Sequence, residues 1–335
     1  MKTCLITGGF GFIGSNFILY ILKERKDIAI INIDDITYAA SPKNLPDNLA
    51  NYKFYKINIA DKPALSEVFD NNEIDYVVNF AAESHVDRSI ISPGVFIKTN
   101  VEGTLNLLEV SLKHSVKRFL QISTDEVYGS LGKEGKFSEK TPLSPRSPYS
   151  ASKAAADMLV MSFFHTYDMP VLISRCSNNY GPYQFPEKLI PLVVINALNN
   201  KNIPLYGDGK NIRDWIYVLD HVKGICAILE NGKAGEVYNI GGDSEMENEE
   251  IIKYILNKLG KPFSLVKYVK DRPGHDKRYA MDFTKITKEM GFFPVYDIEK
   301  GLDLTINWYL NNENWWREIL SGDYKKYYKI MYDHR

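Results

Sequence analysis

A glycine-rich segment near the start of the chain constrains its fold more than any other feature. The letters TGGFGFIG place Gly8, Gly11 and Gly14 three residues apart, after the apolar run TCLIT and before a helical pattern. Glycines in this setting permit a tight turn, let the backbone approach a pyrophosphate, and let a helix pack closely on a strand. The spacing differs from G-x-G-x-x-G, so it is the flanking strand and helix that support the prediction of a dinucleotide site.

Apolar runs alternate with helical patterns through the first half of the chain. We expect strands at 3–8, 28–34, 52–59, 75–82, 117–124 and 170–176, and helices at about 14–25, 62–71, 93–114 and 148–168. Several of the strands are apolar without alternation, as strands buried on both faces are. This order predicts an α/β fold with a Rossmann-type, doubly wound parallel sheet.

The alternation stops after about residue 177, where prolines, glycines and aromatic residues become frequent. We expect a smaller mixed α/β lobe there. The run at 236–242 is typical of a further strand of the sheet, so the lobes are interleaved in sequence. The prediction assigns 1–176 plus about 217–243 to a dinucleotide lobe, and about 177–216 plus 244–335 to a substrate lobe.

The composition of the 335-residue chain favours no nucleic-acid or membrane partner. Its 41 basic and 42 acidic residues leave a formal net charge of −1. No apolar run approaches the roughly 18 residues that span a bilayer. Cys4, Cys176 and Cys226 are too widely spaced for a disulfide framework or a zinc site. We therefore expect a cytoplasmic protein with reduced thiols and no metal.

A carboxylate at the end of the second expected strand indicates which dinucleotide binds. Asp34 lies 20 residues after Gly14 (34 − 14), where an acid binds the adenosine ribose hydroxyls. The same charge would repel a 2′-phosphate, and no Arg follows to accommodate one. The sequence therefore favours NAD over NADP.

The stretch SPYSASK pairs Tyr149 with Lys153 four residues later, on one face of an expected helix. Ser147 can cap this helix, and Pro148 suits its first turn. The positive end of the helix dipole and the ammonium group both favour the phenolate, so we expect Tyr149 to act as a base near neutral pH.

Three polar residues, Thr124, Asp125 and Glu126, directly follow the apolar run KRFLQIS. They form either a solvated strand end or a catalytic acid and base at the edge of the sheet where ligands bind. Neighbours on a regular strand point to opposite faces. The backbone must therefore bend at Asp125, or one of the two carboxylates is only structural.

Further segments support a family resemblance. They are AAESHVDRSI (81–90), STDEVYG (123–129), SPYSASKAAAD (147–157), RCSNNYGPYQFPEKLIP (175–191), IRDWIYVLDH (212–221), DRPGHDKRYAMD (271–282) and a Trp-rich tail. Nearly end to end, the chain resembles the extended short-chain dehydrogenase/reductase family and, within it, the dTDP-glucose 4,6-dehydratases. Epimerases of the same superfamily share the glycines and the Tyr–Lys pair but generally lack the Thr-Asp-Glu triplet, so the triplet is the most specific signal.

The resemblance implies a role for each candidate catalytic residue. Tyr149 takes the proton of the sugar C4 hydroxyl, supported by Lys153, while Thr124 hydrogen-bonds the C4 oxygen. Glu126 then removes the C5 proton, and Asp125 protonates the departing C6 hydroxyl. Bound NAD accepts the C4 hydride and returns it to C6, so the product is a 4-keto-6-deoxy sugar. This chemistry implies a place in deoxysugar biosynthesis, such as the rhamnose pathway.

The resemblance also implies binding residues. Besides the glycines, Asp34, Tyr149 and Lys153, those for the cofactor are Phe12, Ile13, Asp35, Thr37, Asn58, Ile59, Ala81, Ala82, Thr99 and Asn179. Besides Thr124, those for the nucleotide sugar are Ser84, Asn178, Glu187, Lys188, Leu189, Pro204, Tyr206, Arg213, Asn248, Arg272 and His275. The two arginines could clamp phosphate oxygens in bidentate fashion, or could form salt bridges at the surface or between the lobes.

Two positions depart from the family pattern. Asn58 stands where an Asp is common near the adenine, which puts the affinity for NAD in doubt. The letters TYAAS (37–41) replace the usual TYAGN, so we expect the loop around the adenosine ribose to differ.

The helices at 93–114 and 148–168 are also expected, by resemblance, to form a four-helix homodimer contact. The apolar residues in question are Val95, Val101, Leu105, Leu108, Ala155, Leu159 and Phe163. The alternative is that these side chains only cover the sheet.

Other functions stay open at this point. A 4,6-dehydratase of UDP-glucose or another nucleotide sugar would carry the same motifs, because the sequence does not distinguish thymine from uracil recognition. A 4-epimerase is expected to lack the carboxylate pair. A non-catalytic NAD-sensing protein would need neither the Tyr–Lys pair nor the triplet.

Overall fold

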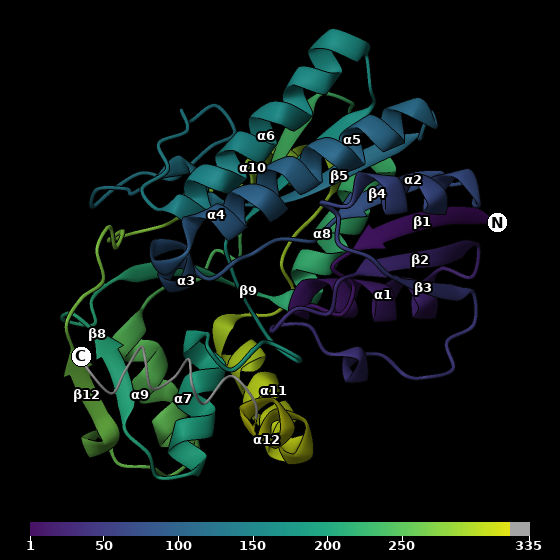
Figure 1. Ribbon diagram of the computed structural model, residues 1–335. Coiled ribbons are helices and arrows are strands. Elements are labelled where there is room, and N and C mark those ends of the chain that lie inside the picture. The colour runs from purple at the N-terminus through teal and green to yellow at the C-terminus, as the bar shows by residue number, and fades with distance from the viewer. Residues whose placement is uncertain (322–335) are drawn as a thin grey trace.

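A seven-stranded parallel sheet forms the centre of the molecule (Figure 1). The computed structural model describes residues 1–321. The strands of this sheet are β1 (Lys2–Thr7), β2 (Ile28–Asp34), β3 (Tyr52–Lys56), β4 (Tyr76–Asn79), β5 (Arg118–Thr124), β6 (Val171–Cys176) and β10 (Glu236–Ile240). Their order, β10-β6-β5-β4-β1-β2-β3, has β1 inside the sheet and crossovers to both sides. This is the doubly wound Rossmann arrangement, and the predicted fold class is confirmed.

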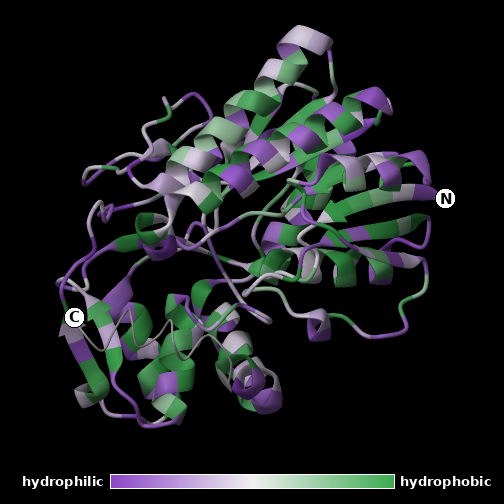
Figure 2. Cartoon of the chain, viewed as in Figure 1, coloured by the Kyte–Doolittle hydropathy of each residue, from purple (hydrophilic) through white to green (hydrophobic). Residues whose placement is uncertain are grey.

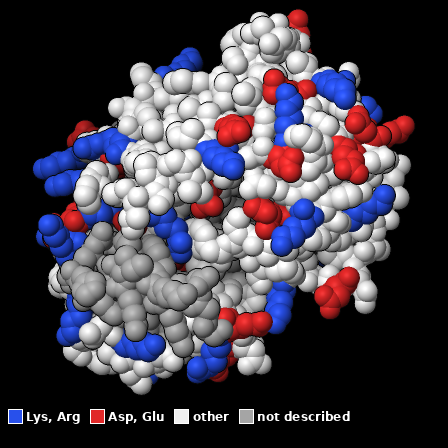
Figure 3. Space-filling view, viewed as in Figure 1, with Lys and Arg blue, Asp and Glu red and all other residues white. Residues whose placement is uncertain are grey.

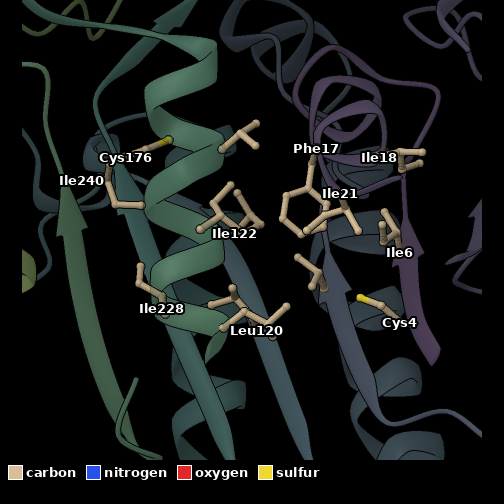
Figure 4. Packing of buried hydrophobic residues seen from close by; sticks show 14 of the residues in the cluster. Cys4, Ile6, Phe17, Ile18, Ile21, Leu120, Ile122, Cys176, Ile228 and Ile240 are labelled. Carbon is tan, nitrogen blue, oxygen red and sulfur yellow. The ribbon is translucent and has the colours of Figure 1, made fainter. Parts of the chain in front are cut away.

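Helices cover both faces of the sheet, and most of the strands between them are apolar (Figure 2). The helices are α1 (Phe12–Glu24), α2 (Lys62–Asp70), α5 (Thr104–Lys113), α6 (Pro148–Tyr167), α8 (Val218–Asn231) and α10 (Thr284–Met290). Phe17 and Ile21 of α1 and Ile228 of α8 belong to one apolar cluster on one face of the sheet (Figure 4). Helices α2, α5 and α6 cover the opposite face. Both faces are therefore buried, as the unbroken apolar strands require.

Two residues expected at a dimer contact lie in this core. Leu108 of α5 and Phe163 of α6 are buried against the sheet, with exposures of 0% and 6%. That part of the dimer prediction is wrong, because these side chains point inward from their helices. Val95 is half exposed and stays available at the surface.

The helix expected at 93–114 is present as a continuous helical segment from Pro93 to Lys113, but its middle part is a π-helix rather than an α-helix. Helices α3 (Val86–Ile91) and α4 (Pro93–Phe96) lead into a π-helical stretch, Ile97–Gly103, before α5 begins. Asn100, in this stretch, donates to the Glu83 carbonyl oxygen at 3.0 Å and to Ser152 Oγ of α6 at 2.8 Å. Such widened turns are frequent at functional sites.

The remaining elements build a second group of layers beside the carboxyl ends of the strands (Figure 1). They are β7 (Asn178–Tyr180), α7 (Leu189–Leu198), β8 (Ile203–Tyr206), β9 (Ile212–Tyr217), β11 (Glu245–Glu247), α9 (Asn248–Lys258), β12 (Val266–Val269), α11 (Ile298–Asn311) and α12 (Glu313–Ser321). Short 3₁₀ turns lie at Pro42–Asn44, Asp125–Tyr128 and Phe263–Leu265. A separate apolar core joins these helices and strands. Of the predicted substrate lobe, residues 322–335 lie outside the described part of the chain.

The surface in Figure 3 carries basic and acidic side chains interspersed over the same face. Within residues 1–321, no helix is both long and apolar enough to cross a membrane. The same residues hold no cluster of three or more His, Cys, Asp or Glu side chains that could bind a metal ion.

Candidate active site

The glycine-rich segment forms the turn from β1 into α1. Gly8 adopts a φ of +69°, and a Cβ there would lie 2.8 Å from the Ala81 backbone nitrogen. A Cβ on Gly14 would lie 2.3 Å from the Gly8 carbonyl oxygen. Only glycine fits these approaches, and they leave a cradle walled by backbone at the start of α1, where a pyrophosphate is stabilised.

A cavity of about 310 Å³ runs from this turn to the carboxyl end of β5. Every residue that the sequence predicts at the cofactor lines it: Gly8, Gly11, Phe12, Ile13, Gly14, Asp34, Asp35, Thr37, Asn58, Ile59, Ala81, Ala82, Thr99, Tyr149, Lys153 and Asn179. Ligands of open α/β sheets bind at this edge. The lining therefore fits a dinucleotide.

The expected adenosine end of the cavity holds two carboxylates that have different hydrogen-bond partners. Asp34 accepts hydrogen bonds from the backbone N–H groups of Phe10 (2.9 Å) and Ile36 (2.7 Å). Burial raises the pKa of Asp34, and these two N–H groups oppose the rise. Asp35 accepts instead from Asn58 Nδ2 at 2.8 Å. The amide at position 58 thus supports Asp35, whereas an Asp there would place a second negative charge against it.

The chain bends directly after β5, as the two carboxylates require. Thr124 is extended, with φ −138° and ψ 153°, and residues Asp125–Tyr128 form a 3₁₀ turn. Thr124 Oγ1 accepts from the Glu126 backbone N–H at 3.2 Å and so caps the turn. Of the two expected alternatives, the structure has the bend at Asp125, and Asp125 and Glu126 both line the cavity.

The two carboxyl groups have different electrostatic surroundings. Burial, and then the charges of Glu126 and Asp214, hold the pKa of Asp125 well above its usual range. Burial also raises the pKa of Glu126, but Arg272, Lys188 and Arg213 oppose that rise. Asp125 is therefore the better proton donor of the pair and Glu126 the better acceptor.

The Tyr–Lys pair lies on the first turns of α6, as predicted. Ser147 caps the helix and accepts from the Ser150 N–H at 3.1 Å, and Pro148 is the first helical residue. Lys153 Nζ donates to the Ile122 carbonyl oxygen of β5 at 2.6 Å. This bond fastens the pair to the strand that ends in the carboxylates.

The expected lowering of the pKa of Tyr149 is wrong for the structure as it stands. Burial, and then the negative charge of Glu126, raise this pKa well above its usual range, and only the nearby Thr124 hydroxyl acts in the opposite direction. Burial also shifts the pKa of Lys153, which it lowers. Burial therefore sets the direction of the shift in the pKa of Tyr149, and the helix start and the neighbouring ammonium group, from which the sequence predicts a lower pKa, do not reverse it.

A second cavity of about 160 Å³ adjoins the first. Glu126, Asn178, Glu187 and Lys188 line both. The predicted sugar-nucleotide residues that line only the second are Leu189, Pro204, Tyr206, Arg213, Asn248, Arg272 and His275, whereas Ser84 and Thr124 line the first. The structure thus brings all of them to one connected space, with Glu126 at the junction.

Several buried polar atoms around this space have no hydrogen-bond partner among the described residues. They are Asp125 Oδ2, Asn178 Oδ1, Gln184 Oε1, Asn248 Oδ1 and Arg272 Nε. An unsatisfied buried polar atom costs about 1–3 kcal/mol. Their concentration around two adjoining cavities indicates a polar ligand that supplies the missing partners.

The two arginines of the second cavity are not equivalent. Arg213 already donates to the carbonyl oxygens of Ile212 and Asp276, both at 2.8 Å, and lies over the Tyr279 ring. Both terminal nitrogens of its guanidinium already donate to backbone carbonyl oxygens, so fewer of its N–H groups can bind a phosphate in bidentate fashion than the sequence suggests. Arg272, with its unpartnered Nε, is the better candidate.

A hydrogen-bond chain that runs from His221 along the wall of the cavity was not predicted from the sequence. His221 Nδ1 lies 2.8 Å from Asn179 Oδ1, and Asn179 Nδ2 donates to the Ser177 carbonyl oxygen (3.0 Å) and to Cys176 Sγ (3.3 Å). Cys176 Sγ in turn donates to the Ser123 carbonyl oxygen at 3.4 Å. Because the Ser177 carbonyl can only accept, Asn179 must turn its oxygen to His221, which donates from Nδ1. The motif YVLDH holds His221, but nothing in its letters shows that it reaches β5.

Comparison with known proteins agrees with this geometry. A protein-family model described as GDP-mannose 4,6 dehydratase matches residues 5–305. A dTDP-glucose 4,6-dehydratase of Xanthomonas campestris is 49% identical over 97% of this chain and 98% of its own length. The Neisseria meningitidis protein of the same name is 46% identical over 97% and 98%.

Solved structures agree as well. A dTDP-glucose 4,6-dehydratase from Bacillus anthracis in complex with NAD has a TM-score of 0.89 at 47% identity, covering 95% of this chain and 100% of its own. The enzyme of that name from Streptomyces venezuelae, also with NAD bound, has a TM-score of 0.92 at 44% identity and the same coverage. A UDP-glucose 4-epimerase from Thermotoga maritima has a TM-score of 0.87 at 29% identity, covering 93% of this chain and 100% of its own.

The fold and the site thus define a nucleotide-sugar-modifying enzyme of the extended short-chain dehydrogenase/reductase class. Within that class, the chain belongs to the dTDP-glucose 4,6-dehydratase family. The resemblance drawn from its motifs is confirmed.

Proposed function

We propose that this protein is an NAD-dependent hydro-lyase that converts dTDP-glucose to dTDP-4-keto-6-deoxyglucose and water. The observation that carries the proposal is the carboxylate pair at the end of β5. Asp125 and Glu126 follow each other on a 3₁₀ turn, line one cavity, and differ in the direction of proton transfer that their surroundings favour. An elimination needs such an acid and such a base at two neighbouring carbons.

Each residue then has a task. Tyr149 takes the proton of the C4 hydroxyl, Lys153 holds the ribose next to the nicotinamide, and Thr124 orients the C4 oxygen. When bound, NAD takes a hydride from C4 and returns it to C6, and its cationic nicotinamide favours ionisation of the Tyr149 phenol.

The 4-ketone acidifies the C5 proton, and Glu126 removes it. Asp125 protonates the C6 oxygen, the C6–O bond breaks, and water leaves. Glu126 then returns its proton to C5. The proton gained by Tyr149 equals in number the one lost by Asp125. Before the next turnover Tyr149 must therefore give up that proton, and Asp125 must take one up, by exchange with solvent.

The nucleotide part of the substrate is assigned to the second cavity, whose lining belongs mostly to the predicted substrate lobe. Arg272 and Lys188 place positive charge there for the diphosphate, and Asn178 and Asn248 offer unpartnered carbonyl oxygens. Parallel assays with dTDP-, UDP-, CDP- and GDP-glucose, each followed by the 4-keto-6-deoxy product, test the base. The proposal predicts the fastest turnover with dTDP-glucose, and faster turnover of UDP-glucose would contradict it.

We also propose a cytoplasmic homodimer that associates through the surface of α3, α4 and α6. Apolar side chains are exposed there, namely Ile90, Ile91, Val95, Ile97, Met158 and Tyr167. Exposed apolar groups that are grouped together mark interaction surfaces in soluble proteins. Their position on neighbouring helices supports a helix-to-helix contact between two copies.

A further inference from the structure

The segment at residues 36–45, which we name the cofactor loop, covers the adenosine end of the first cavity. Thr37, Ala39 and Ala40 line that cavity. The loop begins at Ile36, which has a φ of +55°, a conformation that β-branched residues rarely adopt. Backbone held in such a state persists only where surrounding contacts fix it. The contacts that fix this loop therefore bear on how the cavity is closed.

The first attachment joins the cofactor loop to the glycine-rich turn. The Phe10 carbonyl oxygen, within that turn, accepts from the Ser41 backbone N–H at 3.0 Å and from Asn44 Nδ2 at 2.8 Å. Asn44 is buried, with 2% of its surface exposed. The loop and the turn that would hold the pyrophosphate are thus fastened to each other through one carbonyl group.

The second attachment comes from α12, the last helix of the described residues, in the Trp-rich part of the sequence. Trp315 Nε1 donates to Asn44 Oδ1 at 2.8 Å, and Lys43 Nζ pairs with the Glu318 carboxylate at 2.5 Å. The Trp315 ring also meets Tyr183 edge-on, with centroids 6.0 Å apart. One buried amide, that of Asn44, therefore connects α12 to the glycine-rich turn, since it accepts from one and donates to the other.

The third attachment lies at the opposite end of the loop. Tyr38 OH donates to Glu187 Oε1 at 3.0 Å, and the Arg88 guanidinium lies 3.6 Å from the centre of the Tyr38 ring. Arg88 Nε also donates to Glu187 Oε2 at 3.0 Å. Glu187 lines both cavities. The loop is consequently held from the substrate side as well as from α12.

We propose that the cofactor loop is a strap that retains NAD between turnovers, and that Asn44 and Trp315 are the positioning residues that keep it closed. The proposal rests on the proposed function in one respect, that the first cavity binds NAD. Opening the strap would leave both ends of the buried Asn44 amide without partners, so release of NAD requires the loop and α12 to separate. Retention suits a reaction that regenerates its cofactor in every cycle and has no need to exchange it.

The test measures release of NAD from the full-length protein, separately from its activity. Wild type, Asn44→Leu, Trp315→Phe and the double variant are loaded with NAD, passed into NAD-free buffer, and assayed over time for protein-bound NAD. Asn44→Leu keeps the approximate shape but removes both bonds, and Trp315→Phe removes only the indole donor. Each should release NAD about tenfold faster or more, since loss of one buried hydrogen bond costs about 1–3 kcal/mol. The double variant should be no faster than Asn44→Leu alone, because both changes break one chain of bonds.

Trp308→Phe is the matched control, because Trp308 packs against Trp315 with ring centroids 5.0 Å apart, while the bond to Asn44 belongs to Trp315. This control should release NAD at the wild-type rate. Added NAD should restore turnover of the strap variants, which a change in general stability would not predict. Wild-type release rates in both Asn44→Leu and Trp315→Phe would overturn the strap while leaving the proposed function intact. A wild-type protein that binds no NAD would overturn the cofactor assignment, and the strap with it.

Discussion

At the scale of single residues, burial decides the chemistry of this site more than local charge does. Tyr149 and Lys153 sit where a helix start and a neighbouring ammonium should favour the phenolate, yet burial raises the pKa of Tyr149. Burial also raises the pKa of Asp125, and there the effect serves the proposed reaction because it keeps a proton on the acid. Burial thus opposes the expected role of Tyr149 as a base and supports the expected role of Asp125 as an acid.

Asp125→Asn should slow product formation by about 10²- to 10⁴-fold, the usual contribution of a positioned acid. It should also stabilise the fold at neutral pH. The pKa of Asp125 is raised in the folded state above its unfolded value of about 3.9. The carboxyl group therefore contributes its full stability only below that unfolded value, and this contribution is lost as the pH rises toward the folded pKa.

Urea unfolding of the wild type and Asp125→Asn between about pH 4 and about pH 8 measures this effect, and the difference in unfolding free energy should widen with pH. The exposed Asp47→Asn serves as the control and should show a nearly constant difference. A gap between the wild type and Asp125→Asn that narrows with rising pH would contradict the predicted direction of the pKa shift.

His221 should act on catalysis through Asn179. It is fully buried, and burial lowers its pKa to about 3, so the ring is neutral and donates from Nδ1. His221→Asn keeps a side-chain N–H near that position, whereas His221→Leu has a similar shape and no donor. The Leu variant should lose about tenfold or more in kcat at saturating NAD, because the partly buried Asn179 oxygen loses its donor, and the Asn variant should recover most of that loss. Equal kcat values in the two variants would show that the donor has no such role.

At the scale of elements, the sequence predicts the helices and strands whose local residue pattern agrees with the position that they take in the folded chain. The alternating runs predict the strands of the central sheet. The two-residue period of a strand predicts the bend at Asp125, since two functional neighbours cannot otherwise share a face. Ser147 and Pro148 begin α6 where their chemistry places them.

The elements that were missed depend on contacts from distant parts of the chain. The π-helical stretch at Ile97–Gly103 contains Asn100, whose partners are Glu83 and Ser152. Strands β7 and β11 have three residues each, too few to show a period. The backbone bonds that occupy Arg213, and the link from Trp315 to Asn44, are likewise absent from any local pattern because they join segments far apart in sequence.

Ser147→Ala should destabilise the start of α6, the element that carries Tyr149 and Lys153. The Ser147 side chain accepts from the Ser150 N–H, and Ser150 Oγ accepts from the Ser147 N–H at 3.0 Å. Loss of this reciprocal cap should lower the free energy of unfolding by about 1 kcal/mol, measured by urea denaturation. Ser162→Ala, at an exposed position of the same helix, is the control and should cost less. The prediction fails if the two substitutions have the same effect.

At the scale of the whole molecule, the two adjoining cavities meet at Glu126, between the central sheet and the second group of layers. This arrangement supports the proposed division into a dinucleotide lobe and an interleaved substrate lobe. It also explains how Glu126 can act on both sides. Arg272 and Lys188 oppose the rise in the pKa of Glu126 from one side, and the charge of Glu126 raises the pKa of Tyr149 on the other. The lobes would thus share their reacting centre and divide the binding of the two ligands.

The exposed apolar surface on α3, α4 and α6 should carry the homodimer. Met158→Asp, at a position of α6 that is 60% exposed, should shift the protein from dimer to monomer, because a charge in an apolar contact is not compensated. Light scattering during gel filtration measures the mass directly. Phe293→Asp, at an equally exposed apolar residue elsewhere on the chain, should leave the dimer unchanged. A dimer that persists in Met158→Asp and dissociates in Phe293→Asp would place the contact on another face.

The central claim is that Glu126 and Asp125 perform the elimination after oxidation at C4. Rapid mixing of NAD-loaded Glu126→Gln with dTDP-glucose, with NADH absorbance and the 4-keto-6-deoxy product followed together, tests it most directly. The account predicts that NADH accumulates and persists while product formation falls by about 10²-fold or more, because C4 is oxidised and the C5 proton has no base. Product formation at the wild-type rate, without accumulation of NADH, would contradict it.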